Sequence, residues 1–307
     1  MDLNRMLEKC QRGQWRTEDL DWSRPPPVMS PEKERAVVQY FTDMAGIERL
    51  AAALFETQRA HTTDPVLARI FSTFVTDEQR HARVAELLAA HYDVRQLQVY
   101  RQNEELRVFG FHFLEALRHV PAEVATTYVT VGELLLDVAL LRSIDAYVDD
   151  DMSGEAMERI NRDESRHIAV DFYMTEHYAS PEYQKWLWSQ PWRPLSEHVA
   201  ALWSLANMFR HARPFFRNVF MAPMERVDPT GLRIAEALAR YQALIERPNV
   251  RRRPLPATIH LAQWLSSHRS TRGIAQRLAR TFGLPSVLLT KPDVSARRAS
   301  VGEPRSA

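Results

Sequence analysis

An all-α fold is the class that the sequence predicts, and three observations support it. Only nine of the 307 residues are glycine, and runs of alternating β-branched residues are scarce. Many stretches instead place apolar residues at three- and four-residue spacing, which is the periodicity of an amphipathic helix. We therefore expect helices along almost the whole chain and no β-strand.

Helix start signals divide the first part of the chain into a short arm and four long helices. The arm ends at the pair Ser30–Pro31, and Asp64–Pro65 forms a second pair of this kind. Serine and aspartate are common N-caps, and proline is favoured as the first helical residue. The expected helices span about residues 31–60, 65–92, 121–150 and 153–178, the last two starting at Pro121 and near Ser153.

The connections between these helices predict how they are arranged. The link within each successive pair is short, whereas residues 93–120 form a long connection that contains a helix of its own. Two hairpins joined by one long crossover would form a four-helix bundle. The expected domains are an N-terminal arm, the bundle, a C-terminal helical extension and a flexible tail, at residues 1–30, 31–178, 179–285 and 286–307.

Composition excludes several classes of protein. A hydrophobic content of 45% is enough for a large core. No apolar run is long enough to cross a bilayer, and the first ten residues lack the order of a signal peptide, so we expect a cytoplasmic protein with no membrane partner. Cys10 is the only cysteine. Any metal must therefore be bound by carboxylates and imidazoles.

Charge is distributed unevenly along the chain. Residues 1–180 contain 20 Lys and Arg against 31 Asp and Glu, whereas residues 181–307 contain 20 against 8. The net charge of +1 and the lack of a nucleic-acid-binding motif give no argument for nucleic acid as a partner. The basic segment Arg251–Arg253 is expected to be a solvated basic face, and docking of a carrier-tethered substrate there is the alternative. The tryptophans of WLWSQPW, residues 186–192, could cover the mouth of a substrate pocket, but aromatic clusters after a bundle more often serve packing, which is what we expect here.

A repeated motif indicates the chemistry. Asp-Glu-x-Arg-His occurs twice, in TDEQRH and in RDESRH. It places Glu78 and His81, and likewise Glu164 and His167, three residues apart. Residues at this spacing share one face of a helix. Each copy of the motif therefore presents a carboxylate and an imidazole to the same side.

Each helix with this motif follows a helix with a glutamate in an apolar run, Glu48 in the first pair and Glu133 in the second. Glu48 and Glu78 are 30 residues apart and Glu133 and Glu164 are 31 apart, with the interhelical break midway in each case. In antiparallel helices that rise 1.5 Å per residue, positions equally far from the break lie at one level. Four carboxylates and two imidazoles are therefore expected to converge inside the bundle.

Such a set of side chains is suited to metal ions. Four buried carboxylates without cations would repel one another and be costly to desolvate, whereas two divalent cations would balance them. A Glu from each of two helices and Glu-x-x-His from each of two others form the ligand set of di-iron and di-manganese bundles. Oxygen-rich ligands favour iron, or iron with manganese, over zinc. The expected ligands are Glu48, Glu78, His81, Glu133, Glu164 and His167.

The other letters of the motif place charged groups around these ligands. Asp77 and Asp163 directly precede the liganding glutamates, and a ligating histidine commonly donates its second N–H to a carboxylate. Arg80 and Arg166 can neutralise those carboxylates through charge-assisted hydrogen bonds. Asp137, one turn after Glu133, is either a further acid near the site or a solvated charge.

The doubled motif and its upstream glutamates resemble those of the ferritin-like di-iron carboxylate oxygenases and oxidases, over residues 31–178. The layout is most similar to the N-oxygenases, monooxygenases and acyl carrier protein desaturases of that group. The resemblance implies a ferritin-like four-helix bundle, two iron ions and O2 as a co-substrate. It also implies that Asp77 and Asp163 each serve the histidine of the opposite motif.

Three functions stay open at this point. An oxygenase or oxidase would hydroxylate, N-oxygenate or desaturate a small or carrier-tethered substrate. It would take electrons from an external ferredoxin or flavin reductase, because the chain has no flavin, nicotinamide or iron-sulfur motif. A ferroxidase would need an acidic path for iron in place of an apolar cavity beside the metals. A helical interaction protein would hold a structural metal, and pairing of two copies through an exposed helix also stays open.

Overall fold

The computed structural model describes residues 1–96, 101–281 and 289–292, with the backbone alone described for residues 127–129, 136–138, 255, 275 and 278–281. Within these ranges the protein is helical throughout and contains no β-strand, so the all-α prediction is confirmed. None of the described helices is both long and apolar enough to cross a membrane.

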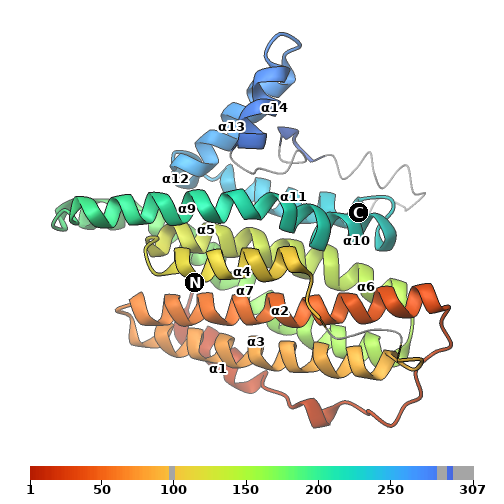
Figure 1. Ribbon diagram of the computed structural model, residues 1–307. Helices are drawn as coiled ribbons and strands as arrows, with labels where there is room; N and C mark the ends of the chain where they lie inside the picture. Colours follow the sequence, from red (N-terminus) through yellow and green to blue (C-terminus); the bar gives the residue numbers. More distant parts are fainter. Residues whose placement is uncertain (97–100, 282–288, 293–307) are drawn as a thin grey trace, which may run out of the picture.

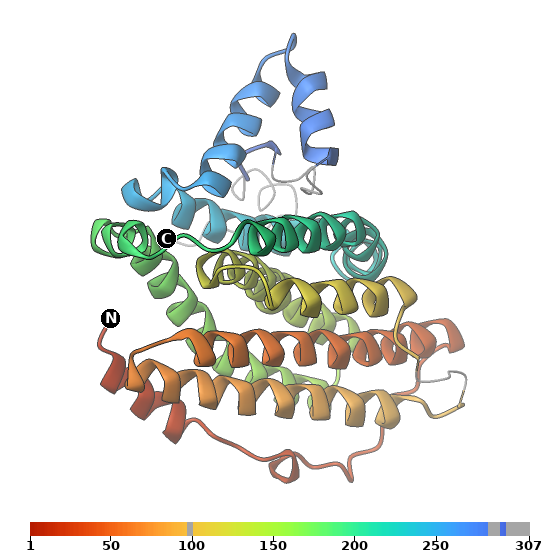
Figure 2. The same cartoon turned by 60° about the vertical axis from the view of Figure 1, so that its left-hand side comes forward.

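Four long helical segments make up the centre of the molecule. They are α2 (Pro31–His61), α3 (Pro65–Tyr92), the continuous run of α5 (Ala122–Glu133), η2 (Leu134–Leu141) and α6 (Arg142–Val148), and α7 (Asp151–Ala179). Helix α2 packs along α3, α5 packs along α7, and both pairs are in contact through α2 with α5 and α3 with α7 (Figures 1 and 2). These contacts bring segments that are far apart in the sequence to one shared interior.

Side-chain caps begin three of these helices. The Ser30 hydroxyl accepts a hydrogen bond from the Lys33 backbone N–H at 3.2 Å, and the Asp64 carboxylate accepts from the backbone N–H groups of the next helix. The fourth long helix is capped by Asp150, which is one of the residues near Ser153 where its start was predicted. The turn before it is made by Asp149 in a left-handed conformation (φ 57°), which aspartate tolerates better than most residues.

The third segment contains a π-helix that the sequence does not reveal. Element η2 follows directly after Glu133, between the α-helical parts α5 and α6. π-helical turns occur mostly as bulges inside α-helices and are frequent at functional sites. The predicted continuous third helix is therefore correct in extent but not in its internal geometry.

The remaining helices surround this centre. They are α1 (Leu3–Arg12), the short η1 (Thr17–Asp19), α4 (Glu104–Leu117), α8 (Pro181–Ser189), α9 (Leu195–Phe215), η3 (Phe216–Met221), α10 (Ala222–Val227), α11 (Leu232–Ile245), α12 (Pro248–Arg251), α13 (Pro254–Ser267) and α14 (Arg272–Thr281). Helix α4 lies in the connection after α3 and packs on α2 and α9, while α11 packs on η2. Helices α13 and α14 pack on each other and project from the body (Figure 2).

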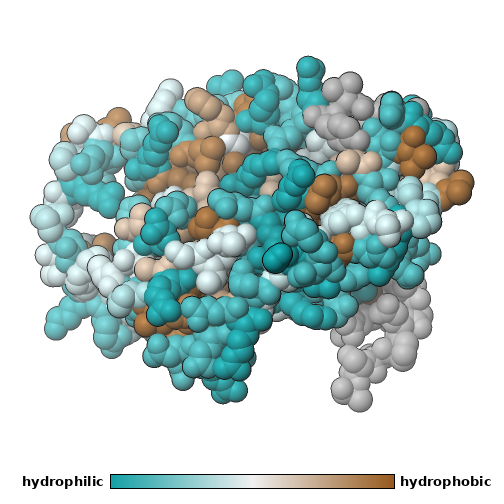
Figure 3. Space-filling model, turned by 90° about the horizontal axis from the view of Figure 1, so that it is seen from below, coloured by the Kyte–Doolittle hydropathy of each residue, from teal (hydrophilic) through white to brown (hydrophobic). Residues whose placement is uncertain are grey.

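The N-terminal segment contains a helix that was not predicted for it. Helix α1 is capped by Asp2 and packs on α3 and α7, where it buries Leu7 and Cys10. The lower face of the molecule, which carries α1 and α3 in Figure 1, has a mainly hydrophilic surface with smaller hydrophobic groups (Figure 3). The segment thus closes one side of the central helices instead of lying free.

The packing expected for the tryptophan-rich segment is wrong. Trp186, Trp188 and Trp192 keep 52%, 79% and 89% of their surface exposed. They lie on α8 and in the turn before α9, which project at one end of the molecule (Figure 1). Their apolar surface has too few neighbouring helices to cover it.

The core consists of two large apolar clusters along the central helices. One contains Met44, Val84 and Ile160, and the other contains Phe55 and Phe74. Burial of side chains of this size contributes about 1.5–3 kcal/mol each. The polar motif residues come between these clusters in sequence on α2, α3 and α7, so apolar packing borders them at both ends.

Candidate metal centre

All six expected ligands are buried in the interior shared by α2, α3, α5 and α7. None of them exposes more than 2% of its surface. They form two overlapping groups in which one ligand atom per residue lies within 4.8 Å of the others. The groups are Glu48, Glu78, His81 and Glu164, and Glu78, Glu133, Glu164 and His167. The structure therefore brings together every residue predicted as a ligand.

The two groups share Glu78 and Glu164, the glutamates of the repeated motif. Each group adds one glutamate and one histidine of its own. Carboxylates that belong to two adjacent cation positions are suited to bridge them, because each has two oxygens. Each of the two groups could hold a metal ion.

Several polar atoms in this interior have no hydrogen-bond partner. Both carboxylate oxygens of Glu78, Nδ1 of His81 and Oε2 of Glu133 are of this kind. His81 Nδ1 lies 3.0 Å from Glu164 Oε1 without hydrogen-bonding geometry, and His167 Nδ1 lies 2.9 Å from Glu78 Oε1. Buried polar atoms without a partner are costly. Their convergence fits cations as the missing partners.

Protonation of the metal-free cluster reflects the same crowding. Burial, together with the neighbouring carboxylate of Glu78, raises the pKa of Glu48 well above its usual value. Burial and the Glu164 carboxylate do the same to the pKa of Glu133. Burial alone would lower the pKa of His81, but the hydrogen bond to Asp163 and the negative charge of the nearby Glu164 carboxylate reverse this and raise it. Without a metal, the cluster retains protons in place of other cations.

The motif aspartates contact the histidines of the opposite motif. His81 Nε2 donates to Asp163 Oδ2 at 2.9 Å, and His167 Nε2 donates to Asp77 Oδ2 at 3.4 Å. Because Nε2 donates to a carboxylate, Nδ1 of each ring is left to face the cluster. The exchange of partners that the family resemblance implies is thus present in the contacts.

Two arginines link the same aspartates. Arg80 Nη2 is hydrogen-bonded to Asp77 and lies 2.9 Å from Asp163 Oδ2, while Arg166 is hydrogen-bonded to Asp163 and lies 3.8 Å from Asp77. Two positive and two negative charges therefore balance each other beside the cluster. The aspartates therefore add no net charge, and once the cluster is deprotonated only the four glutamates carry negative charge that is left for cations to balance.

The sequence did not identify two residues of the N-terminal segment that complete this network. Gln14 Nε2 donates to Asp77 Oδ1 at 2.9 Å, and Trp15 Nε1 donates to Asp163 Oδ2 at 2.8 Å. The Arg80 guanidinium also lies 4.8 Å from the centre of the Trp15 ring. No spacing or motif connects these residues with positions 60 to 150 residues away, so only the path of the chain brings them here.

A further buried acid lies one turn after His167. Asp171 exposes 2% of its surface, its Oδ2 has no hydrogen-bond partner, and burial raises its pKa well above the usual value. The i, i+4 spacing from His167 is a signal that could have revealed it.

Aromatic rings lie against His167. The ring centres of Phe55 and Phe74 are 5.2 and 4.1 Å from the centre of the His167 ring and give this side of the cluster an apolar wall.

The prediction for Asp137 stays open. The side chain of Asp137 lies outside the described residues, and only its backbone, in η2, is described. The π-helical turn changes which residues after Glu133 face the interior, so spacing on an α-helix does not determine its direction.

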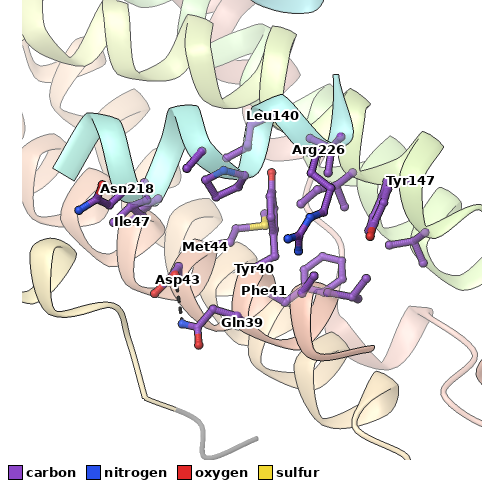
Figure 4. Close-up of a pocket in the computed structure, with 18 residues that line it drawn as sticks. Gln39, Tyr40, Phe41, Asp43, Met44, Ile47, Leu140, Tyr147, Asn218 and Arg226 are labelled. Atoms are coloured by element: carbon purple, nitrogen blue, oxygen red, sulfur yellow. Dashed lines mark hydrogen bonds between the residues drawn. The ribbon is translucent and has the colours of Figure 1, made fainter. Parts of the chain in front are cut away.

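An apolar cavity of about 250 Å³ lies between α2, the η2–α6 segment and the η3–α10 segment. Met44, one turn before Glu48, and Leu140, about two turns after Glu133, are among the residues that line it (Figure 4). The cavity is therefore bordered by the two helical segments that supply the single glutamates of the cluster. Its walls are mainly apolar.

No protein-family model matches this chain, and no curated protein matches it in sequence. The chemistry of the site itself therefore carries the interpretation that follows.

Proposed function

We propose that this chain is a ferritin-like four-helix bundle that binds two iron ions and uses O2 to oxidise a small organic substrate. The observation that carries the proposal is the pair of overlapping buried Glu and His groups that share Glu78 and Glu164. The order of the central helices supports the ferritin-like topology, since α2 with α3 and α5 with α7 are the close pairs and α4 lies in the long connection.

The metal ions would be held by the six residues that converge. Glu48 and His81 would bind one iron, Glu133 and His167 the other, and Glu78 and Glu164 both. Four carboxylates balance the charge of two divalent cations, and oxygen ligands with two imidazoles suit iron or manganese. Two ferrous ions at such a site supply the electrons and the binding positions for O2 reduction.

The rest of the site would orient and protect these groups. Asp163 and Asp77 hold the histidine rings through Nε2. The arginines beside them neutralise the two aspartates, so that these carboxylates add no net negative charge to the site. Phe55 and Phe74 exclude water from one side of the cluster. Asp171, whose raised pKa favours its protonated form, can hold a proton at an oxygen one turn from His167.

The apolar cavity favours an oxygenase or oxidase over a ferroxidase. An enzyme that oxidises an organic molecule needs space for it near the metals, and the cavity lies between the two segments that carry Glu48 and Glu133. A ferroxidase needs an acidic path, whereas the lining here is mainly apolar. The electrons for repeated turnover would come from an external ferredoxin or flavin reductase.

The proposal is tested by anaerobic titration of the metal-free protein with Fe2+, followed by exposure to O2. We expect two irons per chain, O2 consumption and retention of the oxidised iron. Glu48→Ala should lower the iron count, while Glu56→Ala, an exposed glutamate on the same helix, should leave it unchanged. Absence of iron binding would contradict the proposal, and oxidation followed by release of the iron would indicate metal handling instead.

A further inference from the structure

Most of the uncharged or acidic polar side chains that line the cavity between α2 and α10 already form hydrogen bonds within the protein. Gln39 donates to Asp43 at 3.1 Å, and Asp43 accepts a second hydrogen bond, from the Asn103 backbone N–H, at 2.7 Å. Asn218 donates to Glu105 at 2.7 Å. These three lining residues are thus engaged with protein partners, and they define the cavity without requiring a ligand.

Tyr40 differs from them. It exposes only 9% of its surface, and its hydroxyl is buried with no hydrogen-bond partner. It lines the cavity and extends from α2 toward the η3–α10 segment (Figure 4). A buried hydroxyl without a hydrogen-bond partner is unfavourable, because it has lost its bonds to water and gained none in return. Because the surrounding walls are apolar, a ligand oxygen in the cavity would remove this cost.

Arg226 supplies positive charge on the opposite wall. Its side chain comes from α10, lines the same cavity and is 52% exposed, so the charge lies at the edge toward solvent. The only ion pair described for it is a long one, 3.8 Å from Glu32, whose own side chain is 82% exposed. Lys33 adds a second positive charge near this edge, 5.2 Å from the ring of the lining residue Tyr147.

We propose that this cavity binds a small monocarboxylic acid with an apolar body, one oxygen of its carboxylate directed to Arg226 and the other within reach of the Tyr40 hydroxyl. The apolar body would lie toward Met44 and Leu140, the lining residues nearest to Glu48 and Glu133. Guanidinium groups match carboxylates in shape and charge. The exposed Glu32 beside Arg226 disfavours ligands with two negative charges, such as phosphate monoesters.

The size of the cavity limits the apolar body. A cavity of 150 Å³ is enough for one benzene molecule, and this cavity measures about 250 Å³. An aromatic ring or a branched chain with a short linker to the carboxylate is of suitable size. The inference depends on the proposed function only in one respect, namely that the bound acid is then the molecule to be oxidised.

The first test is binding by the full-length, metal-free protein, measured by isothermal titration calorimetry. The probes are 4-phenylbutanoate and its neutral analogue 4-phenylbutanamide. We expect the acid to bind at least about tenfold more tightly than the amide, because only the acid carries a negative charge that can pair with Arg226. Equal binding of acid and amide, or no binding of the acid at millimolar concentration, would overturn the inference.

Two variants locate the ligand. Arg226→Gln should weaken binding of the acid about tenfold and leave the amide unchanged. Tyr40→Phe should weaken acid and amide alike by about two- to tenfold, because both present a carbonyl oxygen. Both should fold normally, since Arg226 is half exposed and the Tyr40 hydroxyl has no partner to lose. Arg118→Gln, which removes an exposed arginine directly after α4, is the matched control.

Iron-loaded protein separates this inference from the proposed function. If 4-phenylbutanoate binds with the expected dependence on Arg226 but the loaded protein consumes no O2, the cavity assignment holds and the oxygenase proposal fails. If the loaded protein consumes O2 but Arg226→Gln and Tyr40→Phe do not affect binding of the acid, the oxygenase proposal holds and the cavity assignment is wrong.

Discussion

The two halves of the cluster carry the same ligands in different surroundings. In the half formed by α2 and α3, both helices are regular, and the position one turn after His81 is Ala85, which is fully buried. In the half formed by α5, η2, α6 and α7, a π-helix follows Glu133, and the corresponding position after His167 is Asp171. Repetition of the residues gives two groups that could each hold a cation, whereas the differing neighbours make the surroundings of the two groups unequal.

The histidines show the same difference. His81 Nδ1 has no hydrogen bond, whereas His167 Nδ1 lies 3.1 Å from Glu164 Oε2 and is hydrogen-bonded to it. The hydrogen bond from Nε2 to an aspartate is longer for His167, 3.4 Å to Asp77, than for His81, 2.9 Å to Asp163. The first half therefore fixes its imidazole more firmly from outside, and the second half has an additional acid close to the cluster.

The largest expected effect separates the shared glutamates from the unshared ones. Glu78→Ala and Glu164→Ala should each reduce bound iron from about two per chain to nearly none, because each residue belongs to both groups. Glu48→Ala and Glu133→Ala should each retain about one iron. Metal analysis after anaerobic loading and gel filtration measures this. Equal losses in all four variants would show that the halves do not form separate cation positions.

The second prediction concerns the aspartates. Asp163→Asn should weaken iron binding about 10- to 100-fold, the usual range for a residue that orients a ligating histidine. Asp77→Asn should have a smaller effect, since its contact with His167 is longer. Competition with a chelator of known affinity measures both. A larger loss of affinity in Asp77→Asn than in Asp163→Asn would mean that the histidine–aspartate distances do not predict which aspartate matters more for iron binding.

The pH dependence of metal binding is the third prediction. Without metal, the raised pKa values of Glu48, Glu133, His81 and His167 mean that these groups hold protons. A metal must displace protons, so its apparent affinity should fall as pH falls and rise as pH rises, by about tenfold per pH unit for each proton released. Calorimetry in buffers of different ionisation enthalpy counts the protons. An affinity independent of pH between 5.5 and 7.5 would contradict the predicted protonation.

The smallest expected effect comes from the N-terminal segment. Trp15→Phe removes the indole N–H that donates to the Asp163 carboxylate and should lower the free energy of unfolding by about 1.5–3 kcal/mol. Trp22→Phe removes an N–H that donates to the neutral backbone carbonyl of Thr17 and should cost less, about 0.5–1.5 kcal/mol. Urea unfolding of the two metal-free variants compares them. Equal losses would show that the charge of Asp163 adds nothing to the Trp15 contact.

Much of this protein could be predicted from local patterns. Proline and N-cap pairs placed the starts of α2 and α3, and the spacing of Glu48, Glu78 and His81 predicted that they meet at one level. These features depend on helical periodicity and on distances along the chain, which the sequence contains directly. The spacing of Glu133, Glu164 and His167 predicted in the same way that these three residues meet at one level, and together the two sets give the six predicted ligands.

Other features depended on tertiary structure alone. The contacts of Gln14 and Trp15 with the motif aspartates result from the path of a segment with no periodic signal. The π-helix after Glu133 and the cap at Asp150 reflect local backbone geometry that similar sequences can adopt in more than one way. The cavity beside Tyr40 exists only because η3 and α10 pack across α2 and α6.

The sequence by itself determined the helical class, the spacing of the repeated motif and the identity of the residues that meet in the interior, because these are properties of single helices and their periods. Only the tertiary structure decided which carboxylate faces which histidine, which aromatic rings lie against His167 and where a cavity forms. Those features are set by contacts between segments far apart in the chain, and helical periodicity carries no information about them.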